Sequence, residues 1–290
     1  MTTTAPYPST DGTPRRSALG EIRSWGRQYA RRHPLQALET VGGQTVLGAR
    51  TLQYLTTDVC TGRFQFWEFV RQAAFMASTA LLPTLLVTVP VAVTLSIQFG
   101  VLAGQVGASS LAGAANGLVV IRQGAPLVAA ILLAAAVGAA VSADLGSRKM
   151  REEIDAMEVM GVSVIQRLIV PRFMAVIVVG VGLTGLVTCA GFFVGYLFNV
   201  FMQEGTPGSF VATFASFAVV GDLGLALCKA VTFGAIVGII SCHKGLATRG
   251  GPAGVANSVN AAVVESILLL MIVNVAMSQL YLLLFPRASL

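Results

Sequence analysis

The chain has 290 residues, of which 55% are hydrophobic and only 11% are charged, with a formal net charge of +6. Soluble domains carry about 25% charged residues, so this chain has too few charges to cover a globular surface. Its apolar runs exceed the ~20 residues that cross a bilayer as a helix, and they do not alternate apolar and polar residues as barrel strands do. The composition therefore predicts an all-α polytopic membrane protein.

The N-terminal part of the chain is predicted to lie outside the bilayer core. Residues 1–16, MTTTAPYPSTDGTPRR, are polar and lack the apolar core of a signal peptide. We expect residues 1–20 to form a disordered cytoplasmic tail. Residues 21–72 mix apolar, basic and aromatic side chains, which is typical of an amphipathic helix, or elbow, lying in the membrane interface. A small cytoplasmic cap is the alternative.

Residues 73–290 are predicted to form the membrane domain. Five apolar segments are long enough to span the bilayer, and they cover residues 73–103, 119–143, 168–201, 210–242 and 255–286. Pro83 and Pro90 should bend or break the first span, because proline cannot donate the helical hydrogen bond. Gly234 and Gly238 in the fourth span have the spacing of small residues at a close helix contact.

The basic residues predict the orientation of these five spans. Sixteen of the 19 Lys and Arg residues fall on one side: nine before the first span, five between the second and third, and two between the fourth and fifth. The positive-inside rule places that side in the cytoplasm. We therefore expect a multi-pass protein of the cell membrane with a cytoplasmic N-terminus and an external C-terminus. The net positive charge needs no nucleic-acid partner.

One charged stretch, SRKMREEIDAMEVMG at residues 147–161, lies between the second and third spans. As a helix ending at Gly161, it would place apolar residues on one face and charged residues on another. The apolar residues are Met150, Ile154, Met157 and Met160, and the charged ones are Arg151, Asp155 and Glu158, with Glu152 beside them. Its bases precede its acids, an order that opposes the helix dipole. The charges could therefore serve a docking surface, and a solvated loop helix is the alternative.

Three ionisable residues, Asp222, Lys229 and Glu265, fall within predicted spans. Such residues usually face the interior of a bundle or a cavity. Depths counted from the predicted span ends suggest a Lys229–Glu265 pair, which would either fix the helix register or form a polar patch for a lipid headgroup or carboxylate. A pair between Asp222 and Arg122, at the start of the second span, is a further possibility.

The sequence contains few signs of catalytic chemistry. It has no phosphate-binding loop of the form G-x-x-x-x-G-K-[ST]. No metal-ligand cluster or nucleophile–base set is recognisable, and we interpret His33 and His243 as surface residues. We therefore expect a protein that is not an enzyme and that carries no cofactor or metal of its own.

Residues 144–172, DLGSRKMREEIDAMEVMGVSVIQRLIVPR, resemble the signature of the MlaE/YrbE permease family. The matching positions are Leu145-Gly146, Glu152, Ile154-Asp155-Ala156, Met160-Gly161 and Pro171-Arg172. The departures are Asp144 for Glu, Glu153 for Gln, Val164 for Pro and Arg167 for an aromatic residue. RRHPLQALETVGGQ at residues 31–44 further resembles actinobacterial YrbE proteins, which accompany mammalian-cell-entry (Mce) proteins.

The resemblance implies a permease subunit of an ABC-type lipid transporter. Its cargo would be fatty acids, mycolic acids, sterols or phospholipids, and the family context favours import. Its partners would be a second, different YrbE chain that forms a heterodimer with it, a cytoplasmic ATPase dimer that binds ATP and Mg, and MCE-domain lipid-binding proteins. Residues 147–161 would be the coupling helix, with Arg151, Glu152, Asp155 and Glu158 contacting the ATPase. The alternatives are a self-sufficient secondary transporter or channel, and a membrane scaffold.

Overall fold

The computed structural model describes residues 18–62, 65–105, 107, 117, 119–202, 206–217 and 220–284. The chain divides into two compact units, Met1–Thr45 and Val46–Leu290. In the first unit the described residues form the beginning of helix α1 (Ala18–Thr61). Most of the predicted tail, residues 1–17, lies outside the described residues. The rest of α1 belongs to the second unit, where Gln166 donates a 2.6 Å hydrogen bond to Asp58.

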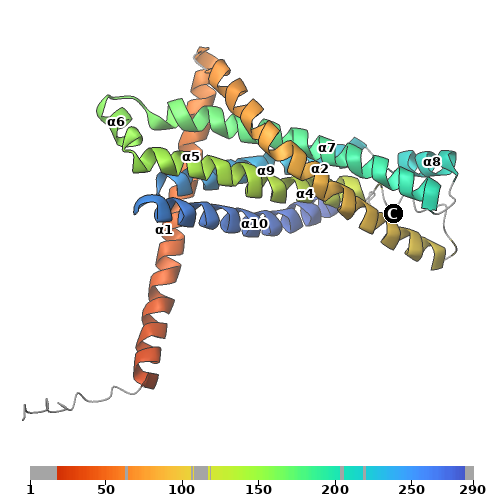
Figure 1. Ribbon diagram of the computed structural model, residues 1–290, viewed down its shortest axis with the longest axis horizontal. Helices are drawn as coiled ribbons and strands as arrows, with labels where there is room; N and C mark the ends of the chain where they lie inside the picture. Colours follow the sequence, from red (N-terminus) through yellow and green to blue (C-terminus); the bar gives the residue numbers. More distant parts are fainter. Residues whose placement is uncertain are drawn as a thin grey trace, which may run out of the picture. The chain divides into compact units, whose positions relative to one another are not determined.

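The second unit is a bundle of long helices, and no described residue lies in a strand (Figure 1). Five helical stretches are long and apolar enough to cross a membrane, as predicted. They are Phe66–Gln105, Val120–Met150, Ile165–Met202, Gly221–Leu246 and Gly251–Leu284. The fold is therefore that of an all-α polytopic membrane protein.

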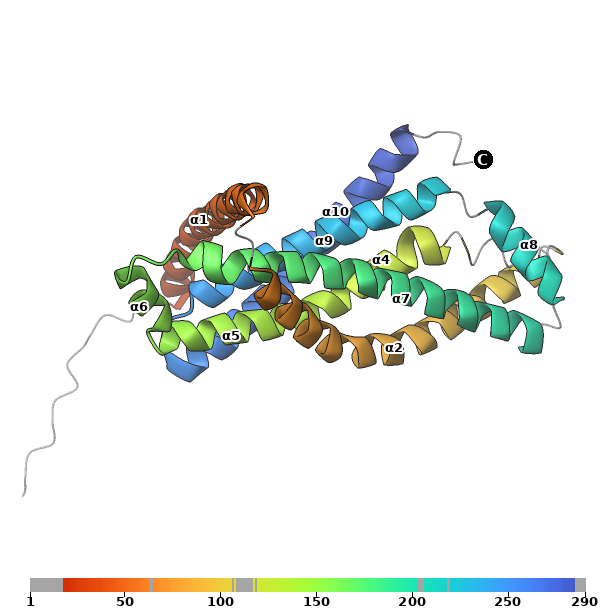
Figure 2. The same ribbon diagram turned by 90° about the horizontal axis from the view of Figure 1, so that it is seen from above.

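The first span is helix α2 (Phe66–Gln105), which begins seven residues before the predicted span and so includes the end of the predicted elbow. Pro83 and Pro90 both lie inside it, and the helix is curved but continuous (Figure 2). The Thr94 hydroxyl donates to the carbonyl of Pro90, and Thr84 donates to the carbonyl of Ala80. These bonds do not replace the two helical bonds that the prolines remove, whose acceptors would be the carbonyls of Thr79 and Leu86. The prolines therefore bend the span without breaking it.

The second span alternates between π-helix and α-helix. It consists of η2 (Val120–Gly124), α4 (Ala125–Leu132), η3 (Leu133–Gly138) and α5 (Ala139–Met150). After a short helix, α6 (Glu153–Val159), the third span begins with η4 (Ile165–Ile169) and continues as α7 (Val170–Met202). Short π-helical turns inside α-helices often occur at functional positions, and η2 carries Arg122.

The predicted fourth span, residues 210–242, is wrong at its beginning. It merges α8 (Pro207–Phe217) with α9 (Val220–Leu246), which are separate helices. Hydropathy could not separate them, because both are apolar and the first charge is Asp222. Phe210 and Phe214 of α8 instead pack on Phe192 of α7, with ring centroids 6.0 Å and 4.6 Å away.

The centre of the bundle lies where α7, α9, the second span and α10 (Gly251–Leu284) pack together. Small residues allow α7 and α9 to approach closely: a Cβ atom at Gly234 would lie 2.8 Å from the Cα of Ile177. At Gly238 it would lie 3.1 Å from the Phe173 ring. Both predicted glycines therefore mark a close helix contact.

Candidate functional site

A buried ammonium group lies inside the membrane bundle. Lys229 of α9 is fully buried, and its Nζ donates three hydrogen bonds. The acceptors are the carbonyl of Arg122 at 2.9 Å, the side-chain oxygen of Gln123 at 2.6 Å and the hydroxyl of Ser278 at 2.8 Å. An ammonium has three donors, so this one is fully satisfied without a carboxylate.

An ion pair lies beside this ammonium group. The Arg122 Nε donates to Asp222 at 2.6 Å, and the Tyr281 hydroxyl donates to the same carboxylate oxygen at 3.2 Å. The Arg122 guanidinium also lies 6.0 Å from the centre of the Tyr281 ring. Asp222 is buried, whereas the Arg122 side chain is 22% exposed. The predicted Arg122–Asp222 pair is therefore confirmed, and it joins the start of the second span to the start of α9.

Arg122 and three hydrogen-bond partners of Lys229 and Asp222 line one cavity of about 270 Å³. Arg122, Gln123, Ser278 and Tyr281 supply its polar wall, and the rest of its lining is apolar. A cavity with a few converging polar groups among apolar side chains is the usual form of a small-molecule site. We call the residues Arg122, Gln123, Asp222, Lys229, Ser278 and Tyr281 the inner polar network.

The predicted Lys229–Glu265 pair is wrong. Glu265 instead pairs with Lys244 at 2.6 Å, while Lys229 meets Ser278. The prediction placed the ends of the fourth and fifth spans at the same level. Glu265 lies 14 residues after the start of α10 but meets Lys244, two residues before the end of α9. The first turns of α10 therefore extend past the end of α9. Lys229 contacts Ser278, which lies 13 residues after Glu265, or about 20 Å along the axis of α10.

The charged stretch at residues 147–161 is two helices, not one. Helix α5 ends at Met150 and α6 begins at Glu153, because Glu152 adopts a left-handed backbone conformation with φ of 59°. Gly161, with φ of 76°, follows the end of α6, so the predicted stop is confirmed. The predicted apolar face is only partly buried: Ile154 is 3% exposed, but Met160 is 70% exposed.

The break also reverses the argument from the helix dipole. Arg148 and Lys149 lie in the last turn of α5, and Glu153 and Asp155 lie in the first turn of α6. Both placements stabilise a helix dipole. The order of bases and acids would oppose the dipole of a single long helix, but it stabilises the dipoles of the two separate helices. This order is therefore no evidence for an external partner.

The four predicted coupling residues differ in their contacts. Arg151 donates to Glu153 at 2.7 Å, and Lys149 donates to Asp155. Glu152 and Glu158 form no ion pair with any residue that the structure describes, and both are exposed. After Glu158 come Val159, 90% exposed, and Met160. The surface of α6 that remains open to a partner is therefore centred on Glu158 and Val159.

The sequence reasoning missed Gln123, Ser278 and Tyr281. Each is an ordinary polar residue in an apolar span, and only the register of α9 against α10 brings Ser278 and Tyr281 to the buried charges. Among the described residues, no group of three or more His, Cys, Asp or Glu side chains could hold a metal ion. The inner polar network therefore consists of amide, hydroxyl and ionic groups.

Five membrane-length helices around buried, paired charges define a multi-pass membrane protein. Residues 69–280 match the family described as Permease MlaE, and the chain belongs to that family. The chain is thus a member of a family of transporter permeases.

Curated relatives agree with this assignment. A probable ABC transporter permease protein of Synechocystis is 33% identical over 174 residues, covering 60% of this chain and 66% of its own length. A probable ABC transporter permease protein of Rickettsia bellii is 29% identical over 160 residues, 55% of this chain and 62% of its own length. The TRIGALACTOSYLDIACYLGLYCEROL 1 protein of Arabidopsis thaliana is 27% identical over 227 residues, 77% of this chain and 64% of its own length. The matches thus span slightly less than two thirds of these relatives.

Proposed function

We propose that this protein is the membrane permease subunit of an Mce-type ABC transporter that moves lipids, with import across the cell envelope as its direction. Candidate cargoes are fatty acids, mycolic acids, sterols and phospholipids. The observation that carries the proposal is the exposed α6 between the second and third spans of a chain from an ABC permease family. A short, exposed helix at that position suits contact with a soluble ATPase.

The inner polar network supports a lipid as cargo. It combines an apolar cavity of about 270 Å³ with a partly exposed Arg122. Such a combination suits a molecule with an apolar tail and an anionic or polar head. The name of the Arabidopsis relative, which is that of a glycolipid, points in the same direction.

The remaining parts of the transporter belong to other chains in this proposal. A second YrbE chain completes the membrane part as a heterodimer, and MCE-domain proteins handle lipid outside the membrane. A cytoplasmic ATPase dimer binds ATP and Mg and contacts α6, so this chain catalyses no reaction. The basic residues of α5 and η4 support a cytoplasmic location for α6, and hence a cytoplasmic N-terminus and an external C-terminus.

Purification of the protein from its native membrane tests this proposal. Mass spectrometry should identify a co-purifying ATPase, a second permease chain, MCE-domain proteins and a bound lipid. Recovery of this chain without an ATPase, but with solute movement across vesicle membranes, would support a self-sufficient secondary transporter instead. Recovery without an ATPase or any transport would leave a scaffold as the better description.

A further inference from the structure

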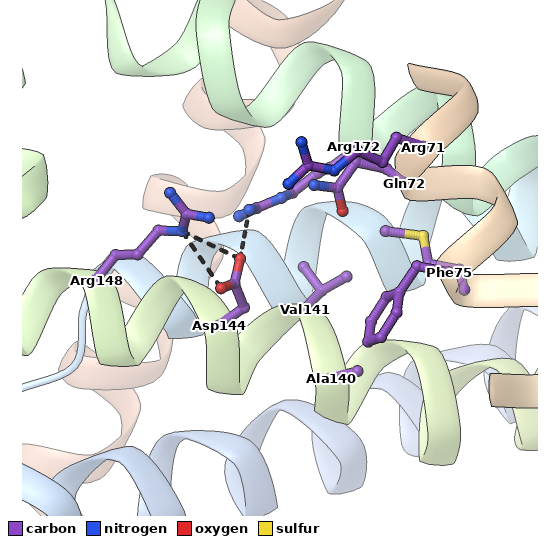
Figure 3. Close-up of a pocket in the computed structure, with 9 residues that line it drawn as sticks. Arg71, Gln72, Phe75, Ala140, Val141, Asp144, Arg148 and Arg172 are labelled. Atoms are coloured by element: carbon purple, nitrogen blue, oxygen red, sulfur yellow. Dashed lines mark hydrogen bonds and ion pairs between the residues drawn. The ribbon is translucent and has the colours of Figure 1, made fainter. Parts of the chain in front are cut away.

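A second cavity lies at the other end of the bundle, where α2 begins, α5 ends and α7 begins. It has a volume of about 370 Å³ and is lined by Arg71 and Gln72 of α2, Asp144 and Arg148 of α5, and Arg172 of α7 (Figure 3). It shares no lining residue with the cavity of the inner polar network. We call it the arginine cavity.

The arginine cavity carries more positive charge than its own residues neutralise. Asp144 is its single carboxylate, and it accepts hydrogen bonds from both Arg148 and Arg172. Arg71 forms no ion pair with a residue that the structure describes. Three guanidinium groups against one carboxylate leave a formal charge of +2 on the lining. Glu153, which lies outside the lining, pairs with Arg148 at 3.8 Å and offsets part of this charge.

One of these arginines is buried with a free donor. The Arg172 side chain is only 2% exposed, and its Nη1 atom has no hydrogen-bond partner among the described residues. A buried, unsatisfied charged donor is costly. Arg172 lines the cavity, and guanidinium groups bind phosphate and carboxylate oxygens well. Because Nη1 has almost no accessible surface, an anion in the cavity would supply the missing acceptor only after a small shift of the Arg172 side chain.

The cavity is polar at one end and apolar at the other. Arg71 and Arg148 lie near the helix ends, whereas Phe75 is one turn farther along α2 and Val141 is two turns back along α5. The charged groups therefore lie toward the end of the bundle and the apolar lining lies deeper. A free phosphate would contact only the charged end of the cavity. A phospholipid would place its headgroup at the charged end and its acyl chains along the deeper apolar lining.

The start of α2 places this cavity at the depth of lipid headgroups. Phe66 and Trp67 are 65% and 80% exposed, and exposed aromatic residues are enriched at the membrane–water interface. Arg71 follows Trp67 by one turn. Phe75, which lines the cavity, is itself 59% exposed, so the cavity borders the side of α2 that faces the surroundings of the bundle.

We propose that the arginine cavity binds the phosphate group of an anionic membrane phospholipid, with Arg71, Arg148 and Arg172 as its ligands. This lipid is a resident of the permease and distinct from any cargo at the inner polar network. It joins the start of α2 to α5 and α7 by bridging their arginines. The inference depends on the membrane location of the chain and not on its proposed transport function.

Lipid titration of the purified full-length protein, followed by native mass spectrometry, tests the proposal. The probes are dioleoyl-phosphatidylglycerol, dioleoyl-phosphatidylcholine and inorganic phosphate. We expect one phosphatidylglycerol per chain, bound about tenfold more tightly than phosphatidylcholine. Both lipids offer a phosphate, but the choline ammonium of phosphatidylcholine is repelled by the arginines of the lining. Arg71→Gln should remove most of this preference, and Arg71→Gln/Arg148→Gln should remove all of it.

The matched control is Arg167→Gln. Arg167 is an exposed arginine of η4 that does not line the cavity, so this variant should keep the preference. Arg71 is exposed, and its replacement should leave the fold intact. Equal affinity of the wild type for the two lipids would overturn the proposal, as would an equal loss in Arg71→Gln and Arg167→Gln. If excess inorganic phosphate alone stabilises the protein against heating and displaces phosphatidylglycerol, the occupant is free phosphate and the lipid proposal is wrong.

Discussion

The inner polar network and the arginine cavity both gather charge, but they satisfy it differently. In the network, Lys229 makes three hydrogen bonds, and Asp222 accepts from both Arg122 and Tyr281. In the arginine cavity, Asp144 accepts hydrogen bonds from two arginines, whereas the buried Nη1 atom of Arg172 has no partner among the residues that the structure describes. The difference indicates that the network holds helices together by itself, whereas the arginine cavity is completed by a ligand. If the network holds helices together, substitutions in it should lower stability more than substitutions in the Lys244–Glu265 pair or on the surface of α6.

Lys229→Met should cause the largest loss. It removes three interhelical hydrogen bonds from a fully buried position. Hydrogen bonds between membrane helices contribute about 0.6 kcal/mol each on average and up to about 1.7, so we expect a destabilisation of about 2 kcal/mol. Thermal unfolding in detergent, followed by size-exclusion chromatography, measures it. Lys244→Met is the matched control, because Lys244 lies on the same helix in a half-buried pair. An equal loss in both variants would contradict the special role of Lys229.

Asp222→Asn should have an intermediate effect. The amide retains the shape of the side chain and can still accept from Tyr281, but the ion pair with Arg122 is lost. Because Arg122 is partly exposed, water can solvate the guanidinium, and we expect a loss of about 1 kcal/mol. The same unfolding assay measures it. Asp155→Asn is an instructive comparison, because this surface carboxylate should cost less. A larger loss at Asp155 would contradict the burial argument.

Glu265→Gln should cost less than about 1 kcal/mol, because Glu265 is 31% exposed and its partner Lys244 is 19% exposed. The more informative measurement is a double-mutant cycle. Lys244→Met and Glu265→Gln should couple, since the residues are in contact, whereas Lys229→Met and Glu265→Gln should be additive. Coupling between Lys229→Met and Glu265→Gln would support the register of α9 against α10 that the sequence predicted, and it would contradict the observed register.

The Glu265 result illustrates how much of the fold the sequence could predict. Five spans, their order and the bend at Pro83 and Pro90 follow from composition and from proline chemistry, which are local properties. The pairing of Lys229 does not, because it depends on how far α10 extends past α9. A shift of two or three turns between antiparallel apolar helices leaves hydropathy unchanged.

The charged stretch shows the same limit on a smaller scale. Its amphipathic pattern predicted one helix through residues 147–161, but a single left-handed residue, Glu152, divides it. Glutamate carries no strong signal for that conformation. Recognition of the family signature from residues 144–172 did not depend on this detail, and the match over residues 69–280 confirms the family.

Substitutions on the open surface of α6 should have the smallest effect on stability. Glu158 and Val159 are exposed and contribute little to packing, so Glu158→Lys and Val159→Asp should each change unfolding by less than about 0.5 kcal/mol. If α6 docks the ATPase, the same variants should sharply reduce the amount of ATPase recovered with the permease. Arg167→Gln, exposed on the neighbouring η4, is the matched control and should retain it. Undiminished recovery of ATPase with Glu158→Lys/Val159→Asp would show that the ATPase contacts another surface, because reversed charge and a buried aspartate are not tolerated at a desolvated interface.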